Sequence, residues 1–323
     1  MAGSTAAASL LSRMRLPVIG APLFIVSNPK LVVAQCAAGI VGSFPALNAR
    51  PQAALDAWLV EIKERLADAP GAAPFAVNQI VHKSNNRLMQ DMEVIVKHEV
   101  PIVITSLGAR KEVNDAVHSY GGIVLHDIIN NRFAKKAVEK GADGLVAVAW
   151  GAGGHAGTQS PFALVEEIRE WFDGPLALSG AMATGRHVLA AQAAGADFAY
   201  MGSTFIATEE ANASSEYKQA IVEGDADQIV YSSLFTGVKG NYLRQSIVNQ
   251  GLDPDDLPAS SADGSQTDFG SGGASDSKAW RDIWGCGQGI GVLKDVPTTA
   301  AKVDRMEAEY KAAVVALAAK YGA

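Results

Sequence analysis

Eight short apolar runs recur along the first two thirds of the chain, and their spacing restricts the folds that this sequence can adopt. The runs are rich in β-branched residues and lack polar alternation, which is typical of parallel strands covered on both faces. They cover residues 18–21, 40–43, 75–79, 102–105, 123–127, 144–149, 176–179 and 198–201. Helical patterns lie between them over residues 29–38, 51–66, 86–98, 110–119, 132–140, 161–171 and 185–194. Eight such repeats predict an α/β fold, a (β/α)8 barrel.

An open, doubly wound sheet is the main alternative to a barrel. That fold places a G-x-G-x-x-G turn after its first strand to hold a dinucleotide. This chain has APLFIVSNP at residues 21–29 instead, so a dinucleotide site of that kind is disfavoured.

The last third of the chain departs from the regular alternation. A helix is expected over residues 214–222, a mixed segment over 231–251, and a long helix from about 298 to 321. Residues 258–278 are rich in Ser, Gly and Asp, which predicts a flexible loop. We therefore expect residues 1–208 and 291–323 to form the barrel. Residues 209–290 would form an inserted cap beside the C-terminal mouth.

Composition excludes several classes of partner. The net charge is −7 and no Lys/Arg-rich run occurs, so nucleic acid is not an expected partner. No apolar run reaches about 18 residues, and the N-terminus lacks the pattern of a signal peptide, so we expect a soluble cytoplasmic protein. Cys36 lies in an apolar helical pattern and Cys286 in a glycine-rich loop, and neither predicts a disulfide.

A glycine-rich loop with a single histidine follows the sixth strand. Residues 144–157 read GLVAVAWGAGGHAG, so His155 is surrounded by glycine and alanine. Little side-chain bulk lets a flat ligand lie against the backbone, and an imidazole titrates near neutrality. A tight strand–helix turn with an exposed histidine is the structural alternative. His155 is nevertheless the first candidate for a general base.

Small residues also follow the seventh and eighth strands. Ser179, Gly180 and Ala181 come after one strand, and Gly202 and Ser203 come after the next. In a barrel these two strand ends form the usual phosphate site, where backbone N–H groups bind the anion. Ordinary strand–helix turns are the alternative explanation for each segment taken alone.

Several segments resemble those of the FMN-dependent nitronate monooxygenases, also called 2-nitropropane dioxygenases. The resemblance runs from about residue 16 to residue 293 and includes a late WGCGQGIG segment. The most specific segments are IGAPLF (19–24), PFAVN (74–78), GAGGHAG (151–157), LSGAMATG (178–185) and GADFAYMGSTFIAT (195–208). This resemblance implies an FMN-binding TIM barrel with an inserted second domain.

The resemblance also implies a role for individual residues. His155 matches the family's catalytic base, which takes the α-proton of a neutral nitroalkane. The phosphate of FMN would bind at the two small-residue segments and the isoalloxazine ring near the first and third strand ends. The implied cofactor-binding residues are Ala21, Pro22, Leu23, Asn78, His126, Gly153, Gly154, Ser179, Gly180, Ala181, Gly202, Ser203 and Gln288.

Two positions depart from the family pattern. Some relatives have a lysine at the fifth strand end that approaches the flavin, whereas this chain has His126 and Asp127. The opening APLF also replaces the more common APM, which changes a side chain close to the expected flavin. Both departures lie beside the expected flavin, where they affect which substrate the site accepts.

Three functions follow from the resemblance. The first is an FMN-dependent oxygenase that oxidises alkyl nitronates or nitroalkanes with O2 to carbonyl compounds and nitrite. The second is an FMN-dependent NAD(P)H reductase of quinones or enoyl thioesters, from the same clan. The third is a flavin- or phosphate-binding protein without redox turnover. The sequence does not decide whether the chain forms a homodimer.

Other polar residues have weaker claims to the site. His82, Lys239 and Arg244 can reach a pocket or can be solvated, and the sequence leaves both readings open. His98, His118 and His187 lie in helical patterns and are expected at the surface, as are Glu209 and Glu210. No His/Cys/Asp spacing predicts a metal site.

Overall fold

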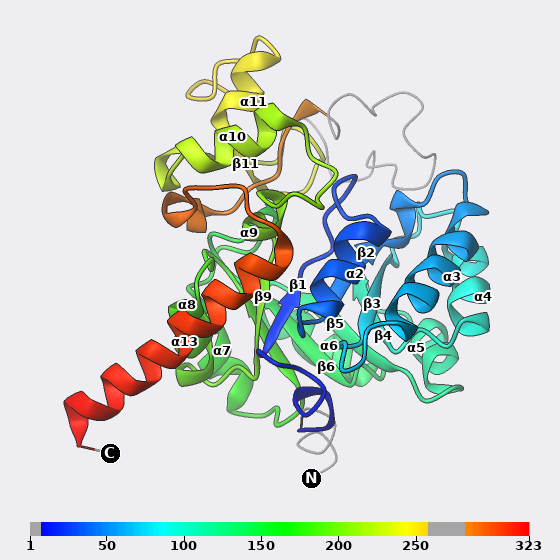
Figure 1. Ribbon diagram of the computed structural model, residues 1–323. Helices are drawn as coiled ribbons and strands as arrows, with labels where there is room; N and C mark the ends of the chain where they lie inside the picture. The colour runs from blue at the N-terminus through cyan, green and yellow to red at the C-terminus, as the bar shows by residue number, and fades with distance from the viewer. Residues whose placement is uncertain (1–7, 258–281, 323) are drawn as a thin grey trace.

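The eight predicted strands form one parallel sheet that closes on itself. The computed structural model describes residues 8–257 and 282–322 (Figure 1). The strands are β1 (Val18–Gly20), β2 (Gly42–Pro45), β3 (Phe75–Ile80), β4 (Ile102–Ser106), β5 (Ile123–Ile128), β6 (Gly144–Val148), β8 (Leu176–Ser179) and β9 (Phe198–Met201). They pair in the order β1-β9-β8-β6-β5-β4-β3-β2. A parallel bridge between Ile19 and Val41 then joins β1 to β2. The predicted TIM barrel is confirmed.

Helices surround the sheet and cover its outer face. They are α2 (Pro29–Ala37), α3 (Ala54–Ala67), α4 (Leu88–Lys97), α5 (Lys111–His118), α6 (Asn131–Glu139), α7 (Pro161–Arg169) and α8 (Gly185–Ala193). The last position is taken by the C-terminal helix α13 (Thr299–Tyr321), which packs beside α8 (Figure 1). A Cβ on Gly185 would overlap the Met306 carbonyl oxygen, so glycine is what permits this close approach.

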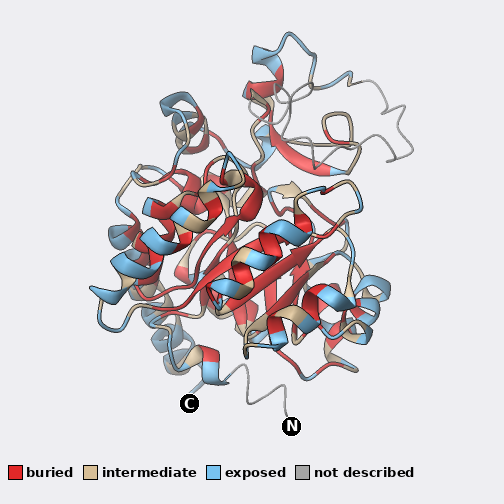
Figure 2. Cartoon of the chain, turned by 90° about the vertical axis from the view of Figure 1, so that its right-hand side faces the viewer, coloured by how far each residue is buried: buried red, intermediate tan, exposed pale blue. Residues whose placement is uncertain are grey.

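The strand residues divide into two alternating sets, as the two-residue period of a strand requires. One set, which includes Val77, Val103 and Val124, packs against the helices. The other set fills the barrel interior and includes Ile19, Ala76, Ile104, Leu125 and Phe198. Figure 2 shows the resulting concentration of buried residues in the sheet and on the inner sides of the helices.

The segment after β9 lies over the carboxyl ends of the strands (Figure 1). Its elements are α9 (Ser203–Ile206), α10 (Ser215–Glu223), η2 (Ala226–Gln228), β10 (Ile229–Ser232), β11 (Gly240–Leu243), α11 (Arg244–Asn249) and η3 (Gln288–Val292). A two-residue strand from the glycine-rich loop, β7 (Gly154–His155), pairs antiparallel with β11. The division at residues 208/209 and 290/291 stays a prediction. The loop expected over 258–278 lies outside the described residues.

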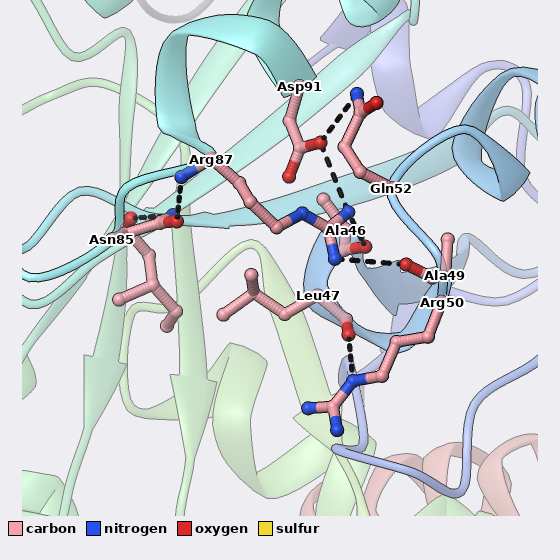
Figure 3. A network of polar contacts seen from close by, with 9 residues as sticks. Ala46, Leu47, Ala49, Arg50, Gln52, Asn85, Arg87 and Asp91 are labelled. Carbon is pink, nitrogen blue, oxygen red and sulfur yellow. Dashed lines mark hydrogen bonds and ion pairs between the residues drawn. The ribbon is translucent and has the colours of Figure 1, made fainter. Parts of the chain in front are cut away.

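A buried polar network ties two loops together at this end of the barrel (Figure 3). The Arg87 guanidinium donates to the carbonyl oxygens of Ala46 and Ala49, at 3.4 and 3.0 Å. It also forms an ion pair with Asp91, whose side chain is fully buried, at 3.1 Å. Burial raises the pKa of Asp91 and the nearby Arg87 charge opposes that rise. The arginine therefore holds the 3₁₀ helix η1 (Ala46–Asn48) against the start of α4.

We expect Arg87→Ala to destabilise the protein by about 3–5 kcal/mol, because the Asp91 carboxylate would stay buried without its partner. The measurement is urea unfolding at neutral pH. Arg65→Ala is the matched control, since Arg65 pairs with Glu61 on the exposed face of α3. Such exposed pairs contribute less than about 1 kcal/mol. Equal losses in the two variants would contradict the assigned role of Arg87.

Candidate functional site

The glycine-rich loop after β6 is held by backbone contacts to the inserted segment. The Gly151 carbonyl oxygen accepts from the Gln288 N–H at 2.9 Å, and the Ala152 carbonyl accepts from the Asn241 side chain at 2.7 Å. A Cβ on Gly153 would lie 2.8 Å from the Gly287 nitrogen. The two loops touch through their backbones, which is why glycine is needed on both sides.

His155 lies in β7, opposite Gly240 of β11. Its Nε2 is 3.0 Å from Thr236 Oγ1, which in turn lies 2.9 Å from the Val238 carbonyl oxygen. A hydroxyl has one proton, so Thr236 can donate it to Val238 and accept from Nε2–H. In that tautomer the lone pair of the imidazole is on Nδ1, where a base needs it.

Burial lowers the pKa of His155 to about 4. The sequence led us to expect titration near neutrality. The structure differs because burial removes solvation and no acidic group within the described ranges offsets that loss. The imidazole is therefore uncharged at neutral pH. It can accept a proton, although as a weaker base than a solvated histidine.

A small cavity lies on the inner side of this loop, between the loop and the ends of β8 and β9. It is lined by Gly151, Ala152, Gly153, Ser179, Gly180, Ala181, Met182, Tyr200, Gly202, Ser203, Gly287 and Gly289. Six of the expected cofactor residues are in this set. Ala181 has a φ of 53°, which is strained for a residue with a Cβ. Its N–H donates to the Gly151 carbonyl oxygen at 3.2 Å.

The loop after β1 lies beside the loop after β9 because the barrel is closed there. The Ala21 N–H donates to the Met201 carbonyl oxygen at 2.8 Å. A Cβ on Gly202 would be 3.2 Å from Leu23 Cδ2. Ala21 and Leu23 therefore lie beside Gly202, which lines this cavity, whereas the place of Pro22 at the cofactor stays a prediction. Gln288 begins η3 between two lining glycines, and its Oε1 would lie 2.9 Å from a Cβ on Gly151.

Asn78 lies inside the barrel near its mouth. Its side-chain nitrogen donates to the Ile104 carbonyl oxygen at 3.0 Å and to Ser106 Oγ at 2.8 Å. Ser106 Oγ donates to Asp127 Oδ2 at 2.6 Å. Three polar side chains from β3, β4 and β5 are therefore joined on the inner face of the sheet.

His126 does not join this group. It is paired in register with Thr105 and hydrogen-bonds to it, and both residues are in the set that faces the helices. Burial lowers the pKa of His126 to about 4. Its expected place at the cofactor stays a prediction, although the residue that faces the barrel interior from β5 is Asp127.

A larger cavity of about 670 Å³ lies on the other side of the glycine-rich loop. It is lined by Ile129, Asn130, Asn131, Arg132, Ala156, Gly157, Thr158, Gln159, Glu167, Tyr231, Val238 and Lys239. Tyr231 donates to the Ala156 carbonyl oxygen at 2.9 Å and packs edge-on against Trp150. Residues 151–153 thus line the small cavity and residues 156–159 line the large one, and His155 lies between these two stretches of the loop.

Comparison with known families identifies the family of this chain. The sequence profile described as nitronate monooxygenase matches residues 46–298, most of the chain. The chain belongs to the nitronate monooxygenase family.

Relatives of this nitronate monooxygenase-family enzyme have several different names. The "(3aS,4S,5R,7aS)-5-hydroxy-7a-methyl-1-oxo-octahydro-1H-indene-4-carboxyl-CoA dehydrogenase" of Rhodococcus jostii (strain RHA1) is 24% identical over 233 residues, 72% of this chain and 64% of its own. The chain spans about half to two thirds of the length of the first curated relatives that it matches.

Two solved structures have the same fold. FabK from Thermotoga maritima matches with a TM-score of 0.78 and 21% identity over 98% of both chains. Nitroalkane oxidase from Streptomyces ansochromogenes matches with a TM-score of 0.77 and 23% identity, over 96% of this chain and 99% of its own.

Most of the weaker candidates have structural roles in this family member. Arg244 pairs with Asp255 at 2.7 Å, and His82 Nδ1 lies 2.9 Å from Ser84 Oγ. Lys239 lines the larger cavity.

The expected surface position of some residues was wrong. His98 is buried and lies 2.8 Å from Asp56, because α4 packs against α3. His187 is half-buried and accepts from the Ala183 N–H at 2.9 Å. Glu210 accepts from the Thr299 N–H and hydroxyl, at 2.9 and 2.8 Å, and so fixes the start of α13.

Both cysteines are buried, and burial raises the pKa of each thiol to about 12. Within residues 8–257 and 282–322, no group of three or more metal-ligating side chains gathers. No helix in the described part of the chain is long and apolar enough to cross a membrane.

The residues that the sequence analysis missed are Asp127, Ser106 and Tyr200. All three had appeared in or beside predicted strand ends. These residues could have been identified if the sequence had shown which strand residues face the barrel interior. A strand buried on both faces lacks the alternation of apolar and polar residues that would show this.

Proposed function

We propose that this protein is an FMN-dependent oxidoreductase that oxidises alkyl nitronates or nitroalkanes with O2 to carbonyl compounds and nitrite. The observation that carries the proposal is the position of His155. It is an uncharged base in a loop that separates a small glycine-lined cavity from a larger one. A cofactor in the first and a substrate in the second would meet at this side chain.

The small cavity suits the phosphate of FMN. Its lining comes from four segments and, apart from Met182 and Tyr200, consists of glycine, alanine and serine, so N–H groups rather than cations would hold the anion. A Cβ on Gly180 would lie 2.8 Å from the Trp150 carbonyl oxygen, so this part of the cavity lining has room for glycine alone. Gly180, Ala181, Gly202 and Ser203 would hold the phosphate.

The remaining residues would place the ring system. Leu23 and Gly202 are adjacent, and Asn78 lies on the inner face of the barrel beneath the mouth. Ala21, Pro22, Gly153, Gly154, Ser179 and Gln288 would complete the surroundings. When bound, FMN supplies the electron transfer and oxygen chemistry that protein side chains lack.

His155 would act on a neutral nitroalkane by taking the proton from the carbon that bears the nitro group. The C–H electron pair then stays on the substrate as a planar nitronate, and the proton stays on the imidazole. Thr236 orients the ring by accepting from Nε2–H. A substrate that arrives as the nitronate needs no such step.

The larger cavity would admit the substrate. Tyr231, which packs against Trp150, supplies an aromatic wall, and Lys239 and Arg132 supply positive charge beside one acidic residue, Glu167. The lysine ammonium lies 5.9 Å from the centre of the Tyr231 ring. A nitronate carries one negative charge, which these cations would attract.

We expect His155→Asn to lower the rate with neutral nitroalkane by about 10²–10⁴-fold, because the proton acceptor is lost while a polar side chain of similar reach remains. Oxidation of pre-formed nitronate should be affected far less. The measurement is kcat/KM for both forms of one substrate on the same variant. Equal losses on both forms would reject the role as base, and no loss on either would leave His155 without a part in the reaction.

Gly180→Asp should yield colourless protein, because its Cβ would displace the Trp150 backbone at the cavity wall and its carboxylate would add negative charge beside the phosphate. Flavin content per chain is the measurement. Gly71→Asp is the matched control, since Gly71 also has a positive φ but has open space around its Cα. Full flavin occupancy in Gly180→Asp would show that the phosphate binds elsewhere.

An FMN-dependent NAD(P)H reductase of quinones or enoyl thioesters is the second candidate. The likeness to FabK over nearly the whole chain favours it, as does the volume of the larger cavity, which exceeds what a small nitroalkane fills. Anaerobic mixing with NADH separates the two candidates. We expect the flavin absorbance to persist, and rapid bleaching would favour the reductase.

A further inference from the structure

Two buried polar atoms at the barrel mouth have no hydrogen-bond partner among the described residues. They are Asp127 Oδ1 on β5 and the Tyr200 hydroxyl on β9. Both belong to the inner face of the sheet, and Tyr200 also lines the small cavity. Buried polar atoms without partners are rare in folded proteins, so a pair of them beside a cavity points to a ligand.

Neighbouring side chains fix the orientation of Asp127. Oδ2 accepts from Ser106 Oγ at 2.6 Å, and Ser106 in turn accepts from the Asn78 amide at 2.8 Å. The chain of donors runs from Asn78 through Ser106 to the carboxyl group. It occupies one carboxyl oxygen and leaves the other to face the interior.

Among the residues that the structure describes, no cation compensates the Asp127 carboxyl. Burial raises its pKa to about 7, and the Ser106 hydrogen bond only partly opposes this. The titratable group that faces it is Tyr200 from β9, whose own pKa burial and the Asp127 charge raise. Ser106 on β4 and Asn78 on β3 are neutral. On β6, the residue paired in register with Asp127 is Val146, which is also neutral. Near neutral pH the group can therefore carry a proton and act as a donor.

We propose that Asp127 is a positioning residue for the flavin ring. As a neutral acid, Asp127 donates a hydrogen bond from Oδ1 to the ring, and its ionisation makes the reduction potential of the flavin depend on pH. This inference rests on the proposed FMN site. Asp127 is connected to Asn78 through Ser106, and its charge acts on Tyr200, which lines the small cavity. Tyr200, its neighbour across the interior, would supply the second donor.

A proton balance gives the expected behaviour. Two-electron reduction of bound FMN to its anionic reduced form takes up one proton and adds one negative charge to the site. That charge raises the proton affinity of a nearby carboxylate. Above about pH 7, where Asp127 is ionised before reduction, a second proton would therefore bind at Asp127 as the flavin is reduced.

The test compares the holoprotein with Asp127→Asn, which keeps the size and the donor but cannot ionise. We expect the midpoint potential of wild-type protein to fall more steeply above about pH 7 than below, with one more proton taken up per two electrons. The oxidised flavin spectrum should shift with the same titration. Both changes should be missing from Asp127→Asn. Asp115→Asn is the control, because Asp115 is exposed on α5 and pairs with Lys111.

Identical pH profiles in wild type and Asp127→Asn would overturn the inference while leaving the FMN site intact. Failure of the wild-type protein to bind FMN would instead overturn the proposed function, and this inference with it. Flavin content distinguishes the two failures before any potential is measured.

A measurement on the apoprotein tests the buried carboxyl by itself. Asp127 binds its proton more tightly in the folded chain than at the ordinary value of 3.8, so folding loses stability as the pH rises from about 4 through 7. The urea midpoint of wild type should therefore fall relative to that of Asp127→Asn over this range. A constant difference would mean that Asp127 is not held in its neutral form, which also overturns the proposal.

Discussion

Closure of the parallel sheet is the constraint on which the site depends. The Gly20 N–H donates to the Val41 carbonyl oxygen at 2.8 Å, and the Val41 N–H donates to Val18 at 3.1 Å. These bonds join the first strand to the second after the other strands have paired around the barrel. The loops after β1 and β9 then become neighbours, and all eight carboxyl ends face one mouth. Without closure, Leu23 and Gly202 would lie at opposite edges of an open sheet.

A second constraint is the close backbone approach between the glycine-rich loop and the inserted segment. β7 adds a strand to the small sheet of β10 and β11, so the backbone on either side of His155 is fixed by residues far along the chain. Gly151, Gly153 and Gly287 have no room for a Cβ at this contact. The histidine is therefore positioned by hydrogen bonds of the backbone rather than by its own neighbours in sequence.

Among the described residues, no charge compensates an ionised His155 or Asp127, and this determines the chemistry of the site. His155 and Asp127 are shifted in opposite directions from their usual pKa values, and burial is the first cause for both. Both shifts have the same consequence, because lowering the pKa of a base and raising the pKa of an acid each favour the uncharged side chain. Such a site suits a reaction in which one proton moves and a planar anion forms near the flavin. Positive charge lies farther out, at Arg132 and Lys239 on the larger cavity.

Local sequence patterns sufficed to predict the strands, most of the helices and the barrel, because buried parallel strands and helix-ending glycines leave signals within a few residues. The same patterns placed His155 and the small residues after β8 and β9 at strand ends, which the barrel brings together. They could not tell which of His126 and Asp127 faces the interior. The run IVLHDI is buried on both sides, so only packing in the closed sheet decides its phase. The pKa of His155, the burial of His98 and the contact of Glu210 with α13 likewise follow from tertiary packing. The solvation of a side chain depends on residues that are distant in the sequence and that the local sequence does not specify.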